Sequence, residues 1–290
     1  MAQKTVLITG TSTGIGAACV ARQALAGWKV YAGVRKHEDG ERLLAQVTGD
    51  VTPVIIDVTK REQIDATLER IESEVGHLHG LVNNAGIGIG GPVELLTDDE
   101  WRWQFEVNFF GVVTLTREAM PLVNKANGRF VHMGSIAGRV SGPGFGPYGS
   151  TKHALEAFNW SLRSELGRHT KMRSSLIEPG EIKTAIWEKL DDVVADLEAR
   201  LDGETRRRYQ FMIDGTRAFN VEGAERGIEP DKVAAAVEHA LTARRPKARY
   251  LVGADAKMSA TMARILPDRL REAAMTANDR RLERAGRKLR

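Results

Sequence analysis

The sequence contains a single cysteine, Cys19, which excludes an intrachain disulfide and a cysteine-based metal cluster. We expect Cys19 to be a small buried side chain on a helix. The seven histidines are scattered without ligand spacing, so no metal site is predicted. No apolar run is long enough to span a bilayer, and no charged segment followed by an apolar one opens the chain. These absences favour a cytoplasmic protein without a membrane span.

Positive and negative charges are nearly balanced over most of the chain. The formal net charge is +4, and Lys and Arg clearly outnumber Asp and Glu only from Arg264 onward. Nucleic-acid binding therefore has no support beyond this basic tail. The chain has 290 residues, of which 42% are hydrophobic and 28% charged. It can therefore form one large α/β domain, or two small ones, around a sizeable core.

A glycine-rich loop follows the first apolar run. Residues 4–9 are rich in β-branched side chains, glycines follow at positions 10, 14 and 16, and an Ala-rich stretch continues to Gly27. This order of strand, loop and helix would bring a helix N-terminus and bare backbone N–H groups against a phosphate. The spacing is G-x-x-x-G-x-G, and the loop alone could be a simple turn. Its position after the first strand favours nucleotide binding.

The second predicted strand covers residues 28–34. Its end is where a dinucleotide-binding fold contacts the adenosine ribose. An acidic side chain at this point would bind the ribose hydroxyls of NAD, but the sequence has Val34 followed by Arg35. A carboxylate would repel a 2′-phosphate, whereas a guanidinium binds it in a forked geometry. The sequence therefore favours NADP, with NAD possible. The alternative is that Arg35 is only a solvated residue at a strand end.

Strands and helices then alternate along the chain. The remaining strands are predicted at residues 52–56, 78–83, 129–133, 172–177 and 248–252. The helices between them are long enough to cross over a parallel sheet. We therefore predict an α/β fold with one Rossmann-type doubly wound parallel sheet of about seven strands, and a ligand at the carboxyl ends of the strands. The residues expected at this edge are Gly10, Asp57, Asn83, Ser135 and Pro179.

Tyr148 and Lys152 lie at i and i+4 on a predicted helix of residues 148–168, on one face and one turn apart. An ammonium near a phenol favours the phenolate and would bring proton exchange by Tyr148 toward neutral pH. For an isolated pair, a packed aromatic beside a solvated amine is the favoured explanation, so the assignment depends on the rest of the sequence. Asn108 lies among apolar residues in a helix predicted from the capping box at Thr97 to residue 123. It is either satisfied within the core or distorts the helix for a functional reason.

Together these residues resemble the short-chain dehydrogenase/reductase superfamily. The resemblance covers residues 4–184 and 250–253, and its motifs occur in the family's order and at its usual separations. The matching positions are Thr9, Gly10, Gly14, Ile15, Gly16, Asp57, Asn83, Asn84, Ala85, Gly86, Asn108, Ser135, Tyr148, Lys152, Pro179, Gly180 and Thr184. The segments VYAGVRK and ARYLVGADAK are similar to those of steroid- and retinol-type dehydrogenases of this superfamily.

The resemblance implies an NAD(P)-dependent oxidoreductase that acts on CH–OH or C=O groups. Tyr148 would exchange a proton with the substrate oxygen, and Ser135 would hydrogen-bond that oxygen. Lys152 would lower the pKa of Tyr148 and hold the nicotinamide ribose, and Asn108 would fix a water that links Lys152 to solvent. Cofactor contacts are expected from Gly10, Ser12, Thr13, Gly14, Ile15, Gly16, Arg35, Asp57, Val58, Asn83, Ala85, Gly86, Tyr148, Lys152, Pro179, Gly180, Ile182 and Thr184.

Residues 181–227 lie where this superfamily covers its substrate, and here they form a long, helical, apolar segment. Its large side chains either pack the helices onto the domain or, together with Ile87, Ile89, Val140 and Phe145, line a roomy apolar pocket. We hypothesise a mobile lid and a lipophilic alcohol, ketone or aldehyde as substrate. The alternatives are a reductase of small or acyl-carrier 3-oxo substrates, and a non-catalytic nucleotide-sensing interaction protein.

The chain is expected to divide into a catalytic domain of residues 1–257 and a basic helical extension of residues 258–290. A basic amphipathic tail can rest weakly on a membrane surface or an acidic partner. More often such a tail packs on its own domain or frays. The resemblance also implies a homodimer through the helices that contain Asn108 and Tyr148.

Overall fold

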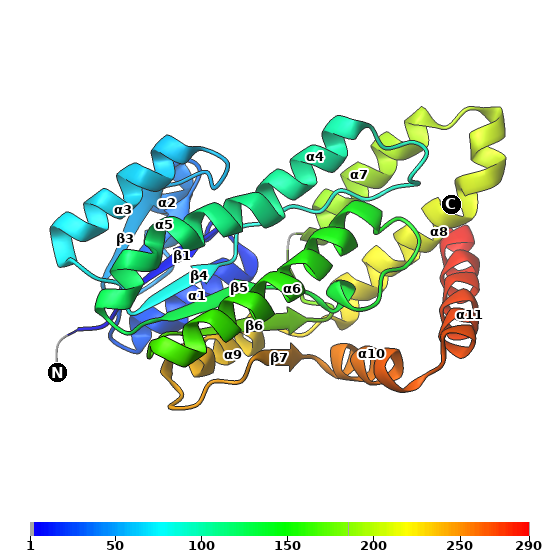
Figure 1. Cartoon of the computed structure of the whole chain (residues 1–290). Helices are drawn as coiled ribbons and strands as arrows, with labels where there is room; N and C mark the ends of the chain where they lie inside the picture. Colours follow the sequence, from blue (N-terminus) through cyan, green and yellow to red (C-terminus); the bar gives the residue numbers. More distant parts are fainter. Residues whose placement is uncertain (1–2, 185, 290) are drawn as a thin grey trace.

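The computed structural model describes residues 3–184 and 186–289. Its centre is a seven-stranded sheet in the order β3-β2-β1-β4-β5-β6-β7, in which every neighbouring pair is parallel (Figure 1). The strands are β1 (Thr5–Thr9), β2 (Lys29–Val34), β3 (Val51–Ile55), β4 (Gly80–Asn83), β5 (Arg129–Met133), β6 (Arg173–Pro179) and β7 (Arg249–Val252). The predicted doubly wound sheet is confirmed, because the order reverses between β1 and β4.

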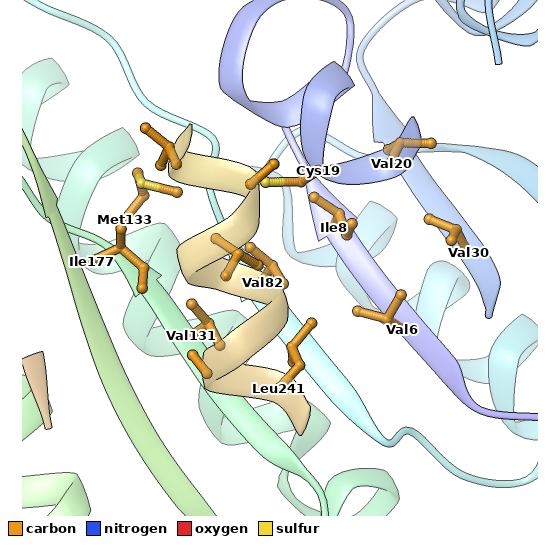
Figure 2. Packing of buried hydrophobic residues seen from close by; sticks show 14 of the residues in the cluster. Val6, Ile8, Cys19, Val20, Val30, Val82, Val131, Met133, Ile177 and Leu241 are labelled. Atoms are coloured by element: carbon orange, nitrogen blue, oxygen red, sulfur yellow. The ribbon is translucent and has the colours of Figure 1, made fainter. Parts of the chain in front are cut away.

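Helices cover both faces of the sheet. They are α1 (Gly14–Leu25), α2 (His37–Leu44), α3 (Arg61–Val75), α5 (Gly111–Lys125), α6 (Gly146–His169) and α9 (Pro230–Thr242). On one face, α1 and α9 bury Cys19 and Leu241 against Val6, Ile8 and the central strands (Figure 2). On the other face, side chains of α3, α5 and α6 pack on Leu7, Leu81 and Phe130. Alternate residues of each strand thus enter opposite cores, as expected for strands covered on both sides.

The sixth strand is longer than predicted. Residues 172–177 were expected to be followed by a break, but β6 continues through Glu178 and Pro179, because Pro179 pairs with Val252 of β7. The fourth strand is shorter than predicted and begins at Gly80. Apolar content alone does not give these ends, because they depend on the neighbouring strand.

The helix predicted over residues 97–123 is interrupted. The capping box at Thr97 and Glu100 starts α4 (Asp98–Phe105), and a π-helical turn (Glu106–Phe110) separates it from α5. Asn108 lies in the middle of this π turn and is buried. The helix is distorted at Asn108, as in one of the two alternatives, and π turns of this kind frequently mark functional sites.

Beyond the carboxyl ends of the strands lie α7 (Ile186–Arg200), α8 (Gly203–Arg226), α10 (Ala254–Ile265) and α11 (Asp268–Gly286) (Figure 1). Helix α11 packs closely on α8: a Cβ on Gly286 would lie 1.8 Å from the carbonyl oxygen of Asp214. Both terminal nitrogens of Arg281 bond the carboxylate of Glu222 on α8. The basic tail thus lies against its own chain. Among the described residues, no helix is long and apolar enough to cross a membrane.

Candidate functional site

The glycine loop is shaped by close backbone approaches. Gly10 has φ +67°, and a Cβ there would lie 2.7 Å from the Cα of Ala85. A Cβ on Gly16 would lie 2.1 Å from the carbonyl oxygen of Gly10. No other residue fits these two positions, because the obstructing atoms belong to the backbone. The loop is thereby pressed against the end of β4.

Three polar side chains hold this loop in place. Thr11 donates through its hydroxyl and its backbone N–H to the carbonyl oxygen of Gly33 on β2. Thr9 Oγ1 accepts from the N–H groups of Asn84 and Ala85. Asn84 Nδ2 donates to the carbonyl oxygens of Thr9 and Gly10, at 2.9 and 3.0 Å. Asn84 was part of the recognised motif but not among the expected contacts, because its partners are backbone atoms of a distant loop.

The ends of β2 and β3 flank this loop. Val34 is buried, and Arg35 follows it with an exposed side chain. Asp57 accepts at Oδ1 from the N–H and the hydroxyl of Thr59, so it forms the turn that precedes α3. Val58 is buried against Gly111, the first residue of α5. Of these residues, Arg35 is the one whose charge is open to solvent.

Asn83 points away from the loop. Its Nδ2 lies 2.9 Å from Thr116 Oγ1 and 3.1 Å from His132 Nδ1, inside the core between the sheet and α5. Burial lowers the pKa of His132 to about 3, so this ring is neutral at physiological pH. The side chain of Asn83 therefore faces the core and is not directed at the cofactor site. Only its backbone reaches the carboxyl edge of the sheet.

Asn108 and Gln104 clamp the segment that follows β4. Asn108 Oδ1 accepts from the N–H of Ile87 at 2.8 Å, and its Nδ2 donates to the carbonyl oxygen of Ile87 at 2.9 Å. One turn earlier, Gln104 bonds the carbonyl oxygen of Ile87 and the N–H of Ile89. The carboxamide of Asn108 is thus occupied by backbone atoms, and the π turn gives it the reach to do this. Sequence reasoning missed Gln104, because a polar residue on a helix normally indicates a solvated face.

Ser135, Tyr148 and Lys152 come together at the carboxyl end of β5. Ser135 caps the short 3₁₀ turn η2 (Ile136–Gly138) by accepting from the N–H of Ala137, and its side chain neighbours the hydroxyl of Tyr148. Lys152 Nζ lies 5.4 Å from the centroid of the Tyr148 ring and donates to the carbonyl oxygen of Met133 at 2.8 Å. The predicted same-face pair is therefore present, with the amine inside the protein.

The electrostatics of this pair differ from the expectation. Burial raises the pKa of Tyr148, and its hydrogen bond with Ser135 only partly opposes this. Burial also lowers the pKa of Lys152 to about 8. The expected lowering of the pKa of Tyr148 is thus not found in the protein by itself, because loss of hydration disfavours the charged forms of both groups.

The turn after β6 lies next to the glycine loop. A Cβ on Gly14 would lie 3.1 Å from Thr184 Cγ2, so residue 184 meets the start of α1. Asp255 of α10 accepts at Oδ2 from the N–H of Glu181, and Gly180 donates its N–H to the carbonyl oxygen of Val252. Ile182 forms a parallel bridge with Ile228. Of the expected cofactor contacts in this turn, Thr184 lies beside the glycine loop, whereas Ile182 is buried in the core.

Many apolar side chains of residues 181–227 pack the helices together. Val194, Leu197, Leu201 and Ile213 are buried with Leu96 in one cluster. For these residues the packing alternative is therefore correct.

A row of aromatic rings connects the same helices to Tyr148. Phe145 lies 6.4 Å from the Tyr148 ring and 5.6 Å from Phe219, which in turn lies 5.5 Å from Trp187, all between ring centroids. These contacts place apolar surface beside the candidate proton donor.

The residues around the loop fit a dinucleotide. Helix α1 begins at Gly14, and the side chain of its N-cap, Thr13, makes no capping hydrogen bond, so the first N–H groups of the helix are available to a phosphate. The glycines leave bare backbone on this surface, and Thr184 closes it on one side. Among the described residues, no group of three His, Cys, Asp or Glu side chains could hold a metal ion.

Comparison with known proteins agrees with this geometry. The family model described as short chain dehydrogenase matches residues 4–194. The uncharacterized oxidoreductase YbbO of Escherichia coli (strain K12) is 34% identical over 270 residues, which cover 92% of each chain. The 17-beta-hydroxysteroid dehydrogenase type 6 of Bos taurus is 34% identical over 280 residues, which cover 94% of this chain and 88% of that protein.

Solved structures give the same result. A short-chain dehydrogenase from Streptomyces avermitilis superposes with a TM-score of 0.76 at 26% identity, and 96% of each chain is covered. The family match extends over more than half of the chain, and the relatives match nearly all of it. The chain belongs to the short-chain dehydrogenase/reductase family and is an NAD(P)-dependent oxidoreductase.

Proposed function

We propose that the protein is an NADP(H)-preferring oxidoreductase that interconverts a lipophilic alcohol with its ketone or aldehyde, with Tyr148 as general acid and base. The observation that carries this proposal is the approach of the buried Lys152 amine to within 5.4 Å of the Tyr148 ring centroid, beside the turn that Ser135 caps. The three groups lie at the carboxyl edge of the sheet, the same edge as the glycine loop.

Bound NADP(H) supplies or accepts the hydride. During reduction, Tyr148 would donate its hydroxyl proton to the carbonyl oxygen, and Ser135 would donate a hydrogen bond to the same oxygen. Lys152 would place its positive charge below the phenol as negative charge develops there. Asn108 would hold the carbonyl oxygen of Ile87 in place, and a water bound nearby would return protons to Lys152 from solvent. In oxidation the same groups would act in reverse.

The preference for NADP(H) rests on Arg35. Its side chain is exposed one residue beyond the end of β2, and Thr11 bonds β2 at Gly33. The cofactor phosphates and Arg35 would therefore lie on neighbouring strand ends, and no carboxylate follows Val34 to bind ribose hydroxyls.

Replacement of Arg35 by Ala is expected to raise the KM for NADPH by about tenfold and to change the KM for NADH by less than about twofold. A guanidinium that binds a 2′-phosphate contributes a charge-assisted hydrogen bond that NADH cannot use. Steady-state kinetics with both cofactors tests this. Lys36→Ala is the matched control, because Lys36 is the adjacent exposed cation. Equal changes with the two cofactors would contradict the assignment.

A lipophilic substrate is supported by the apolar side chains near Tyr148. Phe145 lies 6.4 Å from the Tyr148 ring and 5.6 Å from Phe219, between ring centroids. The relative named for a hydroxysteroid is consistent with this chemistry. A pocket lined by such groups favours bulky apolar ligands.

A panel of short, polar and bulky apolar ketones and aldehydes tests the substrate class. We expect kcat/KM for the bulky apolar compounds to exceed that for the short ones by roughly 100-fold, because buried apolar area contributes to binding in proportion to its size. A preference for small or acyl-carrier 3-oxo substrates would instead support the runner-up activity. Oxidation of NADPH followed at its nicotinamide absorbance is the measurement.

We also propose a homodimer in the cytoplasm that uses α5 and α6. Support comes from large side chains that are exposed on α6 and on the helix that contains Asn108, namely Trp103 of α4, Phe110 of the π turn and Trp160 of α6. Their exposed fractions are 45%, 51% and 47%. Exposed aromatic groups of this size are typical of protein interfaces. Residues 181–227 would act as the lid of each subunit, and residues 258–290 as a packed extension with weak membrane affinity.

A further inference from the structure

Four charged side chains form one cluster behind the candidate site. Arg139 Nε lies 3.1 Å from Glu156 Oε1 and 3.1 Å from Glu178 Oε1. Arg249 bonds Glu156 through Nη2, and its Nε lies 2.9 Å from Glu178 Oε2, within ion-pair range but without hydrogen-bond geometry. Each guanidinium thus faces both carboxylates.

Each member of this cluster comes from a different part of the site. Arg139 follows the η2 turn that Ser135 caps, and Glu156 lies one helical turn after Lys152 on α6. Glu178 immediately precedes Pro179 and Gly180, and Arg249 begins β7. The cluster therefore joins the turn of Ser135, the helix of Tyr148 and the strand that leads to the expected cofactor contacts.

The turn and the helix touch closely at this point. A Cβ on Gly138 would lie 2.8 Å from the carbonyl oxygen of Lys152, and one on Gly149 would lie 1.9 Å from Ser141 Oγ. Ser141 in turn donates its hydroxyl hydrogen to the carbonyl oxygen of Ala137 at 2.9 Å. The turn and α6 meet here through small residues. Their relative position therefore depends on the charged side chains that bridge them.

Burial sets the charge state of this cluster. The side chain of Glu178 is fully buried, and those of the other three are no more than 25% exposed. Burial and the neighbouring Glu156 raise the pKa of Glu178 to about 8, whereas the guanidinium of Arg139 opposes this. Two carboxylates at such a short distance are stable together only if cations neutralise them.

We propose that Arg139 is a positioning residue that locks the Ser135 turn onto α6 and β6, so that the Ser135 hydroxyl stays in register with Tyr148 and Lys152. The proposal rests on the proposed function for its kinetic consequence. It concerns a residue that touches none of the reacting atoms. Its effect passes through the short turn between Ser135 and Arg139.

Replacement of Arg139 by Gln is expected to lower kcat roughly 100-fold, since small misplacements of reacting groups have effects of that order. The Kd for NADPH, measured by quenching of protein fluorescence, should change by less than about threefold, because the glycine loop is not part of the cluster. Arg22→Gln is the matched control. Arg22 also joins two carboxylates, Asp231 and Glu238, but it does so between α1 and α9, far from Ser135 in the chain. This control should retain kcat.

The double variant Arg139→Gln/Glu178→Gln separates positioning from simple charge neutralisation. It removes one cation and one carboxylate, so the charge balance of the cluster is kept and we expect it to fold even if the single variant does not, but it lacks the bridge. We expect its kcat to stay at least about tenfold below that of the wild type. Recovery of full kcat in the double variant, or an unchanged kcat in a folded Arg139→Gln, would overturn the proposal.

Hydrogen exchange measured by mass spectrometry gives a readout that needs no substrate. Peptides that cover residues 134–152 should exchange about tenfold faster in both Arg139 variants than in the wild type and in Arg22→Gln, since local opening governs exchange. Peptides from β1 to β3 should be unchanged. Equal exchange of residues 134–152 in all four proteins would contradict the positioning role. A wild type inactive on every carbonyl compound would instead contradict the proposed function and leave this comparison intact.

Discussion

Replacement of Tyr148 by Phe is expected to lower kcat by about 10³-fold while the Kd for NADPH stays within about twofold of the wild-type value. A positioned general acid typically contributes between about 10² and 10⁴ to the rate. Phe retains the ring that packs 6.4 Å from Phe145 and 5.4 Å from Lys152 Nζ, so the loss is confined to the hydroxyl and its bond with Ser135.

Stopped-flow or steady-state reduction of a bulky ketone, together with a fluorescence titration of NADPH, provides the measurement. Tyr209→Phe is a suitable control, because its hydroxyl bonds Glu94 near the surface and plays no part in the proposed chemistry. Both variants remove one hydroxyl from a tyrosine ring. Full turnover by Tyr148→Phe would exclude this residue as the proton donor.

The architecture of the sheet could be predicted from the sequence because local signals are strong in this class of fold. Buried parallel strands are short apolar runs, and glycines mark the places where the backbone of one loop approaches another. Gly10 and Ser135 could therefore be assigned to the carboxyl edge before any coordinates were known. The ends of β4 and β6 could not, because they are set by pairing with strands that lie far away in the chain.

The interior of the site was predicted less well. The direction of the Asn83 side chain was not predicted: it turns to Thr116 and His132, which are 33 and 49 residues away in the sequence. Gln104 was missed for a similar reason, since its partners are backbone atoms of the segment after β4. The sequence does not distinguish an Asn or Gln that is hydrogen-bonded inside the protein from one that faces solvent.

The pKa values of Tyr148 and Lys152 could not be predicted from their spacing in the sequence. An ammonium beside a phenol was expected to lower the pKa of the phenol, but the hydration of both groups also contributes to their pKa values. In the folded protein Lys152 is buried and Tyr148 is partly buried, so the pKa of Tyr148 is raised and that of Lys152 falls to about 8. Burial thus opposes the attraction between the two charged forms. Of these two groups, Lys152 is the one that titrates closer to neutral pH.

This assignment gives reduction a specific dependence on pH. Because the pKa of Lys152 is lowered to about 8, its ammonium is present below that pH and lost above it. The proposed reduction needs that charge beneath the phenol, whereas Tyr148 stays protonated because its own pKa is raised. We therefore expect kcat/KM for reduction to fall as the pH rises through about 8.

Replacement of Lys152 by Met should remove this pH limb and lower kcat/KM by about 10² to 10³ over the whole range, since loss of one preorganised electrostatic group has an effect of that size. Met keeps an unbranched buried side chain and removes the charge together with the bond to Met133. Lys29→Met serves as the control, because Lys29 is a partly buried lysine on β2 that pairs with Glu74. An alkaline limb near pH 8 that persists in Lys152→Met would mean that another group titrates, and the role of the ammonium would have to be given up.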